Sequence, residues 1–108
     1  MSLIAPKVNA QIIAINSQQA KLSGRLDRLV AKRLLEEGRK LMRLAGSQWQ
    51  IDLSEVTQSS SVGIALLLDW LRFGQQKNIR ITFVNVPHKM RQVIEFSGLN
   101  DVLKDALS

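Results

Sequence analysis

The chain has 108 residues, 45% of them hydrophobic and 22% charged, which predicts one globular domain spanning residues 1–108. Cysteine is absent and histidine occurs once, which excludes a disulfide framework, a thiol nucleophile and a zinc site built from Cys and His. The net charge is +6, and residues 1–50 carry nine Lys and Arg against three Asp and Glu, so the basic excess lies in the first half.

In the first half, alternating and helical apolar patterns predict strands over 11–16 and 19–22, a helix over 28–45 and a strand over 49–53. Asp27 is the expected N-cap of the helix, and Gly46 is the expected residue after its end. In the strand over 49–53, Trp49, Ile51 and Leu53 alternate with polar residues. The strand over 19–22 is expected to stop at Ser23 and Gly24.

In the second half, the patterns predict a polar loop over 55–61, a helix over 62–77 and a strand over 79–83. They also predict a helix from Pro87 to Gly98 and a last short helix capped by Asn100 or Asp101. Helices between successive strands require crossover connections. The expected fold class is therefore α/β, with a small mixed sheet of four to five strands and helices mainly on one face.

No stretch of about 18 apolar residues is present, so no membrane span is expected. The first residues lack the basic start of a signal peptide, which favours a cytoplasmic location. No motif for a catalytic residue, cofactor or metal is evident. Tyrosine is absent and no aromatic RNA-binding strand appears, so nucleic acid is not an expected partner.

Three consecutive serines, Ser59, Ser60 and Ser61, precede the helix over 62–77. One of them is expected to cap that helix, since a hydroxyl oxygen can accept from a free backbone amide. A serine at a helix N-terminus is also a favourable place for a regulatory phosphate, because the helix dipole and exposed amides stabilise added negative charge. The sequence leaves both functions open.

The helix over 62–77 has two apolar stripes, although a helix on a sheet needs to bury only one. One stripe is suited to the sheet and consists of Ile64, Leu67, Leu68 and Leu71. The second consists of Val62, Leu66, Trp70 and Phe73. This second stripe is expected to meet either neighbouring helices or a protein partner, with Trp70 as the expected anchor of an interface.

A basic stripe on the helix over 28–45 consists of Arg28, Lys32, Arg39 and Arg43. A charged helix face of this kind is usually solvated, and Glu36 and Glu37 partly offset its charge. Direct binding of anionic lipid headgroups is the alternative function for this stripe.

Three motifs in this order resemble those of the STAS domain family, which includes anti-sigma factor antagonists and the tails of sulfate transporters. Residues 22–27 (LSGRLD) are similar to the family's L-x-G-x-L-D motif before the first helix, and residues 51–54 (IDLS) lie on the central strand. Residues 60–64 (SSVGI) are similar to the D-S/T-x-G-L motif that opens the second helix. The resemblance extends from about residue 11 to 106.

This resemblance implies a protein-binding switch without catalysis, cofactor or metal. The family's phosphorylatable Ser or Thr matches Ser61, and its usual acidic residue is replaced by Ser60. Because that acid helps to define the site that a partner kinase recognises, the departure bears on whether Ser61 is phosphorylated.

Within the family, residues 65–71 (ALLLDWL) look most like the MlaB group, the STAS subunits of phospholipid ABC transporters that maintain outer-membrane lipid asymmetry. This likeness implies a transporter ATPase subunit as partner, and attachment to the inner membrane only through that partner. The expected contact residues are Ser59, Ser60, Ser61, Val62, Leu66, Trp70 and Phe73. The alternative is an anti-sigma factor antagonist that is regulated by phosphorylation at Ser61 and whose partner is an anti-sigma factor kinase.

Overall fold

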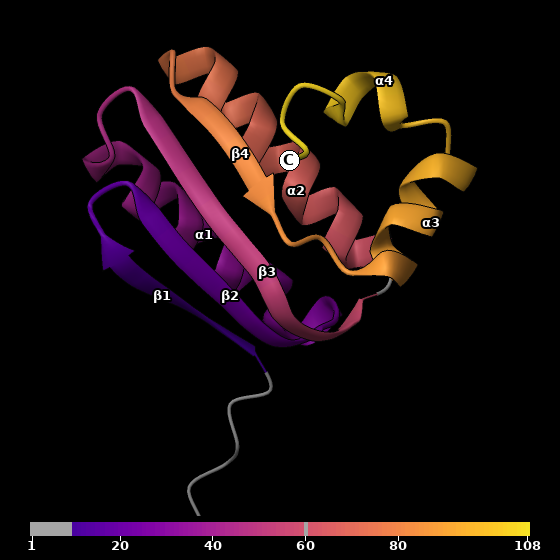
Figure 1. Ribbon diagram of the computed structural model, residues 1–108. Coiled ribbons are helices and arrows are strands. Elements are labelled where there is room, and N and C mark those ends of the chain that lie inside the picture. The colour runs from indigo at the N-terminus through magenta and orange to yellow at the C-terminus, as the bar shows by residue number, and fades with distance from the viewer. Residues whose placement is uncertain (1–9, 60) are drawn as a thin grey trace, which may run out of the picture.

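A computed structural model describes residues 10–59 and 61–108 of the chain. Its four strands form one sheet in the order β1-β2-β3-β4 (Figure 1). The strands are β1 (Ala10–Asn16), β2 (Gln19–Leu26), β3 (Gln48–Ser59) and β4 (Arg80–Val84). β1 pairs with β2 antiparallel, whereas β2, β3 and β4 run parallel to one another.

The helices are α1 (Arg28–Leu44), α2 (Ser61–Lys77), α3 (His88–Phe96) and α4 (Asn100–Leu103). Figure 1 shows α1 and α2 behind the sheet, with α3 and α4 beyond β4. The predicted α/β class, with a small mixed sheet, is therefore confirmed, and the described residues form four strands of that sheet. None of the helices in the described part of the chain is both long enough and apolar enough to cross a bilayer.

β2 and β3 are longer than predicted, and the polar loop expected over residues 55–61 is wrong. Gly24 pairs with Val56 and Leu26 pairs with Ser59, so β2 runs on past Ser23 and β3 continues to Ser59. The sequence misleads here because the far face of the sheet is open to water, so polar residues in β3 do not interrupt the strand.

The caps of α1 agree with the sequence patterns, whereas the cap expected for α4 is wrong, because α4 begins at Asn100 and Leu99 is its N-cap. The Asp27 carboxylate accepts hydrogen bonds from the amides of Leu29 (2.9 Å) and Val30 (3.3 Å) at the start of α1. Gly46 and Gly98 follow α1 and α3 with φ values of 81° and 71°, a left-handed conformation that suits glycine.

Side chains of the central strands alternate between a buried face and an open face. Trp49, Ile51 and Leu53 are each at most 2% exposed, so they belong to the buried face of the sheet. The intervening Gln50 and Asp52 are only half-buried. This alternation confirms the predicted period of two and places the core between the sheet and α1 and α2.

The Trp70 side chain packs closely against α1 in the core. An ideal Cβ on Gly38 would overlap the indole of Trp70, so the indole lies directly against the backbone of α1. The indole N–H of Trp70 donates to the carbonyl of Leu35 at 3.2 Å, and its rings meet those of Trp49 edge-on, with centroids 5.7 Å apart. Gly38 is thus the residue that allows α1 and α2 to lie side by side.

We expect Gly38→Ala to destabilise the domain by about 1–3 kcal/mol, because the new methyl group overpacks the indole of Trp70. Alanine favours a helix over glycine by about 1 kcal/mol, so the packing effect must exceed this gain. Urea unfolding followed by circular dichroism measures the difference, with the exposed α1 variant Lys40→Ala as the control. A Gly38→Ala protein as stable as Lys40→Ala would contradict the packing of Trp70 described above.

Candidate functional site

The carboxyl ends of β2, β3 and β4 meet at one edge of the sheet, where α1, α2 and α3 begin (Figure 1). A hollow of about 490 Å³ opens at this edge. Its lining comes from the segments that follow or end the three strands: Arg25, Leu26, Asp27, Val56, Thr57, Gln58, Ser59, Pro87, His88, Lys89 and Met90. Parallel strands in an open α/β sheet place their functional loops at this edge.

Ser59 and Ser61 lie on either side of the junction between β3 and α2. Ser59 ends β3 and is half-buried, whereas Ser61 is the first residue of α2 and is exposed. The N-terminus of α2 carries the positive end of the helix dipole, which favours a negative charge close to Ser61. Ser60 lies outside the described residues, so the predicted serine cap stays a prediction.

Gly63 permits a close approach at the first turn of α2. An ideal Cβ on Gly63 would overlap the hydroxyl of Ser59 and would lie 3.2 Å from the Cε of Met90 on α3. The side chain of Ser59 therefore lies against the first turn of α2, and α3 packs against the same turn. The close approach of these side chains thus explains why the SSVGI motif has a glycine at this position.

Of the charged side chains that line the hollow, Arg25 and Lys89 are basic and Asp27 is acidic. Lys89 and His88 are exposed residues of α3, and Arg25 lies on β2. Arg25 has an acidic partner, since its Nε lies 3.7 Å from the carboxylate of Asp27, which itself caps α1. The positive charge of Lys89 and the start of α2 together favour an acidic group on whatever binds here.

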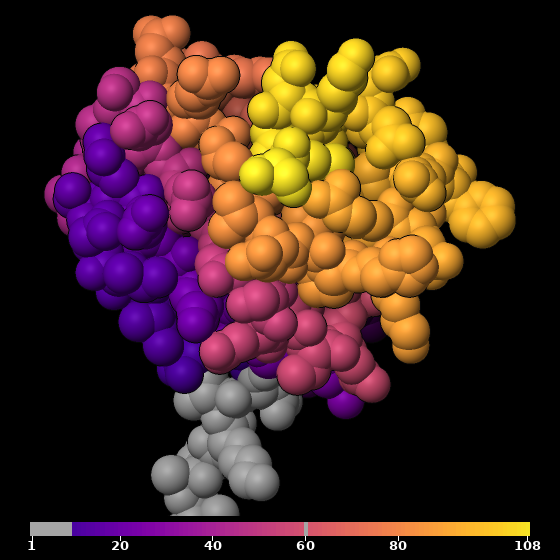
Figure 2. All heavy atoms as spheres, viewed as in Figure 1, coloured from indigo at the N-terminus to yellow at the C-terminus, as the bar shows by residue number. Residues whose placement is uncertain are grey.

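A second hollow, of about 720 Å³, adjoins the first and shares Ser59 and Lys89 with it. Its apolar lining comes from α3: Val93 is 38% exposed and Phe96 is 94% exposed. Figure 2 shows that side chains of the α3 segment project from the molecule on this side. An aromatic ring that is almost fully in water is typical of interface anchors.

The sequence interpretation missed this apolar surface. Only Met90 and Ile94 of α3 are buried in the structure, whereas Val93 and Phe96 face solvent. The available signal was Phe96, a large apolar residue at the end of a short helix that reaches beyond the sheet.

Three of the expected contact residues on α2 are buried within the domain. Leu66, Trp70 and Phe73 are 3%, 0% and 7% exposed, and Val62 is half-buried. The second stripe of α2 therefore meets the neighbouring helix α1, which was one of the two alternatives. The role of Trp70 as an exposed anchor is corrected accordingly, because its indole fills the space above Gly38.

The basic stripe of α1 is divided between packing and solvent. Arg39 forms a two-point ion pair with Asp69 of α2, with N–O distances of 3.0 Å and 2.8 Å. Arg39, Arg43 and Lys77 lie 5.2–5.8 Å from the centre of the Phe73 ring, a geometry of cation–π contacts. Only Arg28 and Lys32 stand free of such contacts with α2, which weakens the case for a lipid-binding face.

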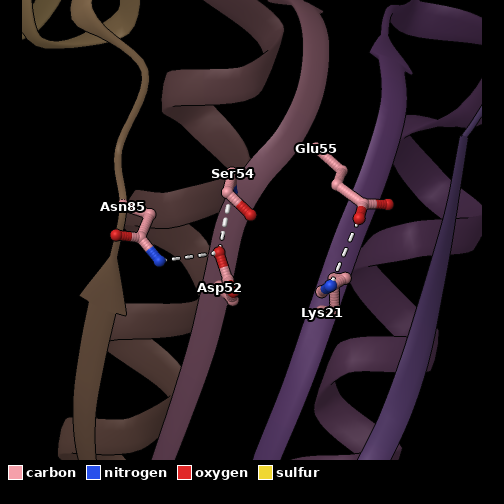
Figure 3. Close-up of polar contacts among 5 residues, drawn as sticks. All are labelled: Lys21, Asp52, Ser54, Glu55 and Asn85. Carbon is pink, nitrogen blue, oxygen red and sulfur yellow. Dashed lines mark hydrogen bonds and ion pairs between the residues drawn. The ribbon is translucent and has the colours of Figure 1, made fainter.

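Polar residues on the open face of the sheet tie β3 to the segment after β4 (Figure 3). The Asp52 carboxylate accepts from the backbone amide of Ser54 at 2.8 Å and from the side-chain amide of Asn85 at 3.2 Å. The bond from Ser54 is the main reason that the pKa of Asp52 lies below its ordinary value of 3.8. Lys21 pairs with Glu55 at 3.2 Å on the same face.

Asn85 has a φ of 55°, so the chain turns there between β4 and Pro87 at the hollow. Its bond to Asp52 fixes this turn and thereby helps to position the start of α3. Within residues 10–59 and 61–108, no group of three or more His, Asp or Glu side chains is placed to hold a metal ion.

The family model described as "Mlab, STAS domain" matches residues 13–105 of the chain. No curated protein sequence matches it significantly. A chain of the Acinetobacter MlaFEDB complex, solved in an ATP-bound conformation, is similar with a TM-score of 0.68 and 25% identity, over 78% of this chain and 88% of that one.

Two further solved structures share the fold. Bacillus SpoIIAA in its phosphorylated form, a cell fate determinant, is similar with a TM-score of 0.67 and 19% identity, over 92% of this chain and 88% of that one. A sulfate transporter family protein from Wolinella succinogenes is similar with a TM-score of 0.68 and 11% identity, over 90% of this chain and 80% of that one.

We expect Asp52→Asn to lower the free energy of unfolding at pH 7 by about 1 kcal/mol or less, because charged acceptors make the stronger hydrogen bonds and this site is partly solvated. A carboxylate with a depressed pKa stabilises the fold above its ordinary pKa and loses that effect as the pH falls through the folded value. The difference between variant and wild type should therefore shrink below about pH 3.8.

Urea titrations at pH 7 and at acidic pH measure this difference, with Asp105→Asn, at an exposed position, as the control. A difference that stays constant across both pH values would show that the charge of Asp52 is not what stabilises the turn.

Proposed function

The chain belongs to the STAS domain family, in the group described as MlaB, and from that premise we propose that it is a non-catalytic protein-interaction subunit of a phospholipid ABC transporter. In this function it binds and supports the ATPase subunit on the cytoplasmic side of the inner membrane, in a system that maintains outer-membrane lipid asymmetry. The similarity to a chain of the MlaFEDB complex supports this proposal.

The observation that carries the interaction is the apolar surface of α3 beside Ser59. Phe96, at 94% exposed, and Val93 border a hollow that reaches Ser59. Burial of one such aromatic ring against a partner supplies a large share of the binding energy of a small interface. We therefore propose that the ATPase binds across Ser59–Val62 and α3, with an apolar side chain in the hollow and an acidic group near Lys89.

This surface differs from the one expected from the sequence alone. Ser59, Ser60, Ser61 and Val62 stay in the proposal, although nothing is described for Ser60. Leu66, Trp70 and Phe73 leave it, because these side chains already pack within the domain. Their proposed role is to hold α2 in place, so that Ser61 stays at a fixed position relative to the start of α3.

The second candidate function is that of an anti-sigma factor antagonist whose partner is an anti-sigma factor kinase. It is favoured by the exposure of Ser61 at the start of α2 and by the shared fold with phosphorylated SpoIIAA. In this function, a phosphate on Ser61 would release the partner by adding charge and bulk at the contact.

We expect tagged wild-type protein to recover an ABC ATPase and its permease from detergent-solubilised membranes of the native host. Phe96→Ser and Ser61→Asp should each lower this recovery at least about tenfold, since one removes the proposed anchor and the other adds charge at the contact. Quantitative mass spectrometry of the bound proteins measures the recovery.

Leu44→Ser is the matched control, because Leu44 is 74% exposed at the far end of α1. Thermal melts should give the same midpoint for all four proteins, so that lost binding is separated from unfolding. ATPase recovery undiminished in Phe96→Ser and Ser61→Asp would contradict the proposed surface. Recovery of a soluble kinase-like protein, with a phosphate of about 80 Da on Ser61, would support the second candidate instead.

A further inference from the structure

In the described part of the chain, the outer edge of β1 is an open edge of the sheet. β1 pairs only with β2 among the strands of the described residues, and it lies on the side of the sheet away from α3 and α4 (Figure 1). The outward backbone amides and carbonyls of an edge strand are ready to pair with another strand. This edge is separate from the surface proposed to bind the ATPase.

The residues of β1 lack the features that normally protect such an edge. Its sequence, AQIIAIN, contains no charged residue and no proline, and its exposed positions include Ile13 (49%) and Ile15 (57%). Protection is confined to the two ends, where Arg33 donates to the carbonyl of Ala10 at 2.6 Å and the register shifts between Ala14 and Asn16. Among residues 10–59 and 61–108, the stretch from Gln11 to Ala14 is left open.

The opposite edge of the sheet is closed by the chain itself. Beyond β4, Phe83 forms a parallel bridge with Leu107, its amide donates to the carbonyl of Ala106 at 2.7 Å, and its carbonyl accepts from Ser108 at 3.0 Å. A chain whose sheet has two free edges can join further copies at both edges and form an open-ended assembly. A chain with one free edge can pair with only one other copy. Pairing through β1 therefore closes at two copies.

We propose that β1 pairs antiparallel with β1 of a second copy of this chain, which joins two four-stranded sheets into one across a two-fold axis. The strand suits its own copy because a two-fold pairing sets equivalent side chains near each other, and uncharged residues then oppose no like charges. Ile13 lies opposite Lys21 of β2, on the open face, and there it would meet the isoleucines of the second strand.

The dimer should be weak and should tighten with salt. A single seven-residue strand buries less area than the roughly 1,200–2,000 Å² of a stable standard interface. Two copies that each carry a net charge of +6 repel one another, and salt screens that repulsion. An interface held by ion pairs would show the opposite salt dependence.

Sedimentation equilibrium of the full chain from about 10 to about 500 µM tests this pairing. We expect a reversible monomer–dimer equilibrium, tighter at high salt, and at least about tenfold weaker in Ile13→Lys because two added charges then face each other. Leu44→Lys, at an exposed site on α1, is the control and should dimerise like the wild type. Hydrogen exchange of the β1 amides should slow as the concentration rises.

A wild-type chain that stays monomeric over this range would overturn the proposal, as would a dimer whose β1 amides exchange at the monomer rate. A variant that lacks residues 1–9 tests whether the chain's own N-terminal segment, and not a second copy, pairs with the edge of β1. Dimerisation only after this truncation would show that the segment covers the edge. If Ile13→Lys does not fold, Ile15→Lys and the exchange measurement decide the question. Loss of ATPase binding in Phe96→Ser leaves these outcomes unaffected.

Discussion

The contact between the indole of Trp70 and the backbone at Gly38 is the constraint on which the arrangement of the helices depends. It sets the separation of α1 and α2, and the bond from the indole N–H to the Leu35 carbonyl fixes the direction of the ring. The ion pair between Arg39 and Asp69 and the cations around Phe73 close the same interface towards solvent. Trp70 thereby joins the two helices to Trp49 of the sheet.

This packing determines where recognition can occur. Because α2 packs against both the sheet and α1, its middle has little apolar surface left for a partner. Exposed polar and apolar groups are instead found at its first residue and on α3, which extends past β4. α2 thus acts as a rigid support, and its first residue and α3 provide the polar and apolar groups that a partner can contact.

Much of the fold could be predicted because its signals are local. Asp27 caps a helix by its own side chain, and the alternation of Trp49, Ile51 and Leu53 follows from the geometry of a single strand. The continuation of β3 to Ser59 depends on pairing with β2, which is a long-range contact that side-chain polarity does not reveal. A local pattern therefore ends a strand too early where one face is open to water.

The candidate site shows the same division. Ser61 could be placed at a helix start from its neighbours in the sequence. The two stripes of α2 could be recognised, but the sequence could not tell whether α1 or a partner covers the second one. Gly38 was the relevant signal, since a glycine in the middle of a helix suggests that another element packs closely against it. The local sequence does not show that this neighbour is Trp70. The exposure of Phe96 depends on how far α3 extends beyond the sheet, which is also a tertiary property.

The edge-on pair of Trp49 and Trp70 also determines which changes in this protein its intrinsic fluorescence can detect. The chain has two tryptophans and no tyrosine, and both indoles are at most 2% exposed. Its intrinsic fluorescence therefore arises almost wholly from one buried pair at the junction of the sheet, α1 and α2. Tryptophan emission will therefore change when the core unfolds. Binding at Phe96 or pairing at β1 will change it little, because phenylalanine and aliphatic side chains do not emit at the wavelength of tryptophan fluorescence.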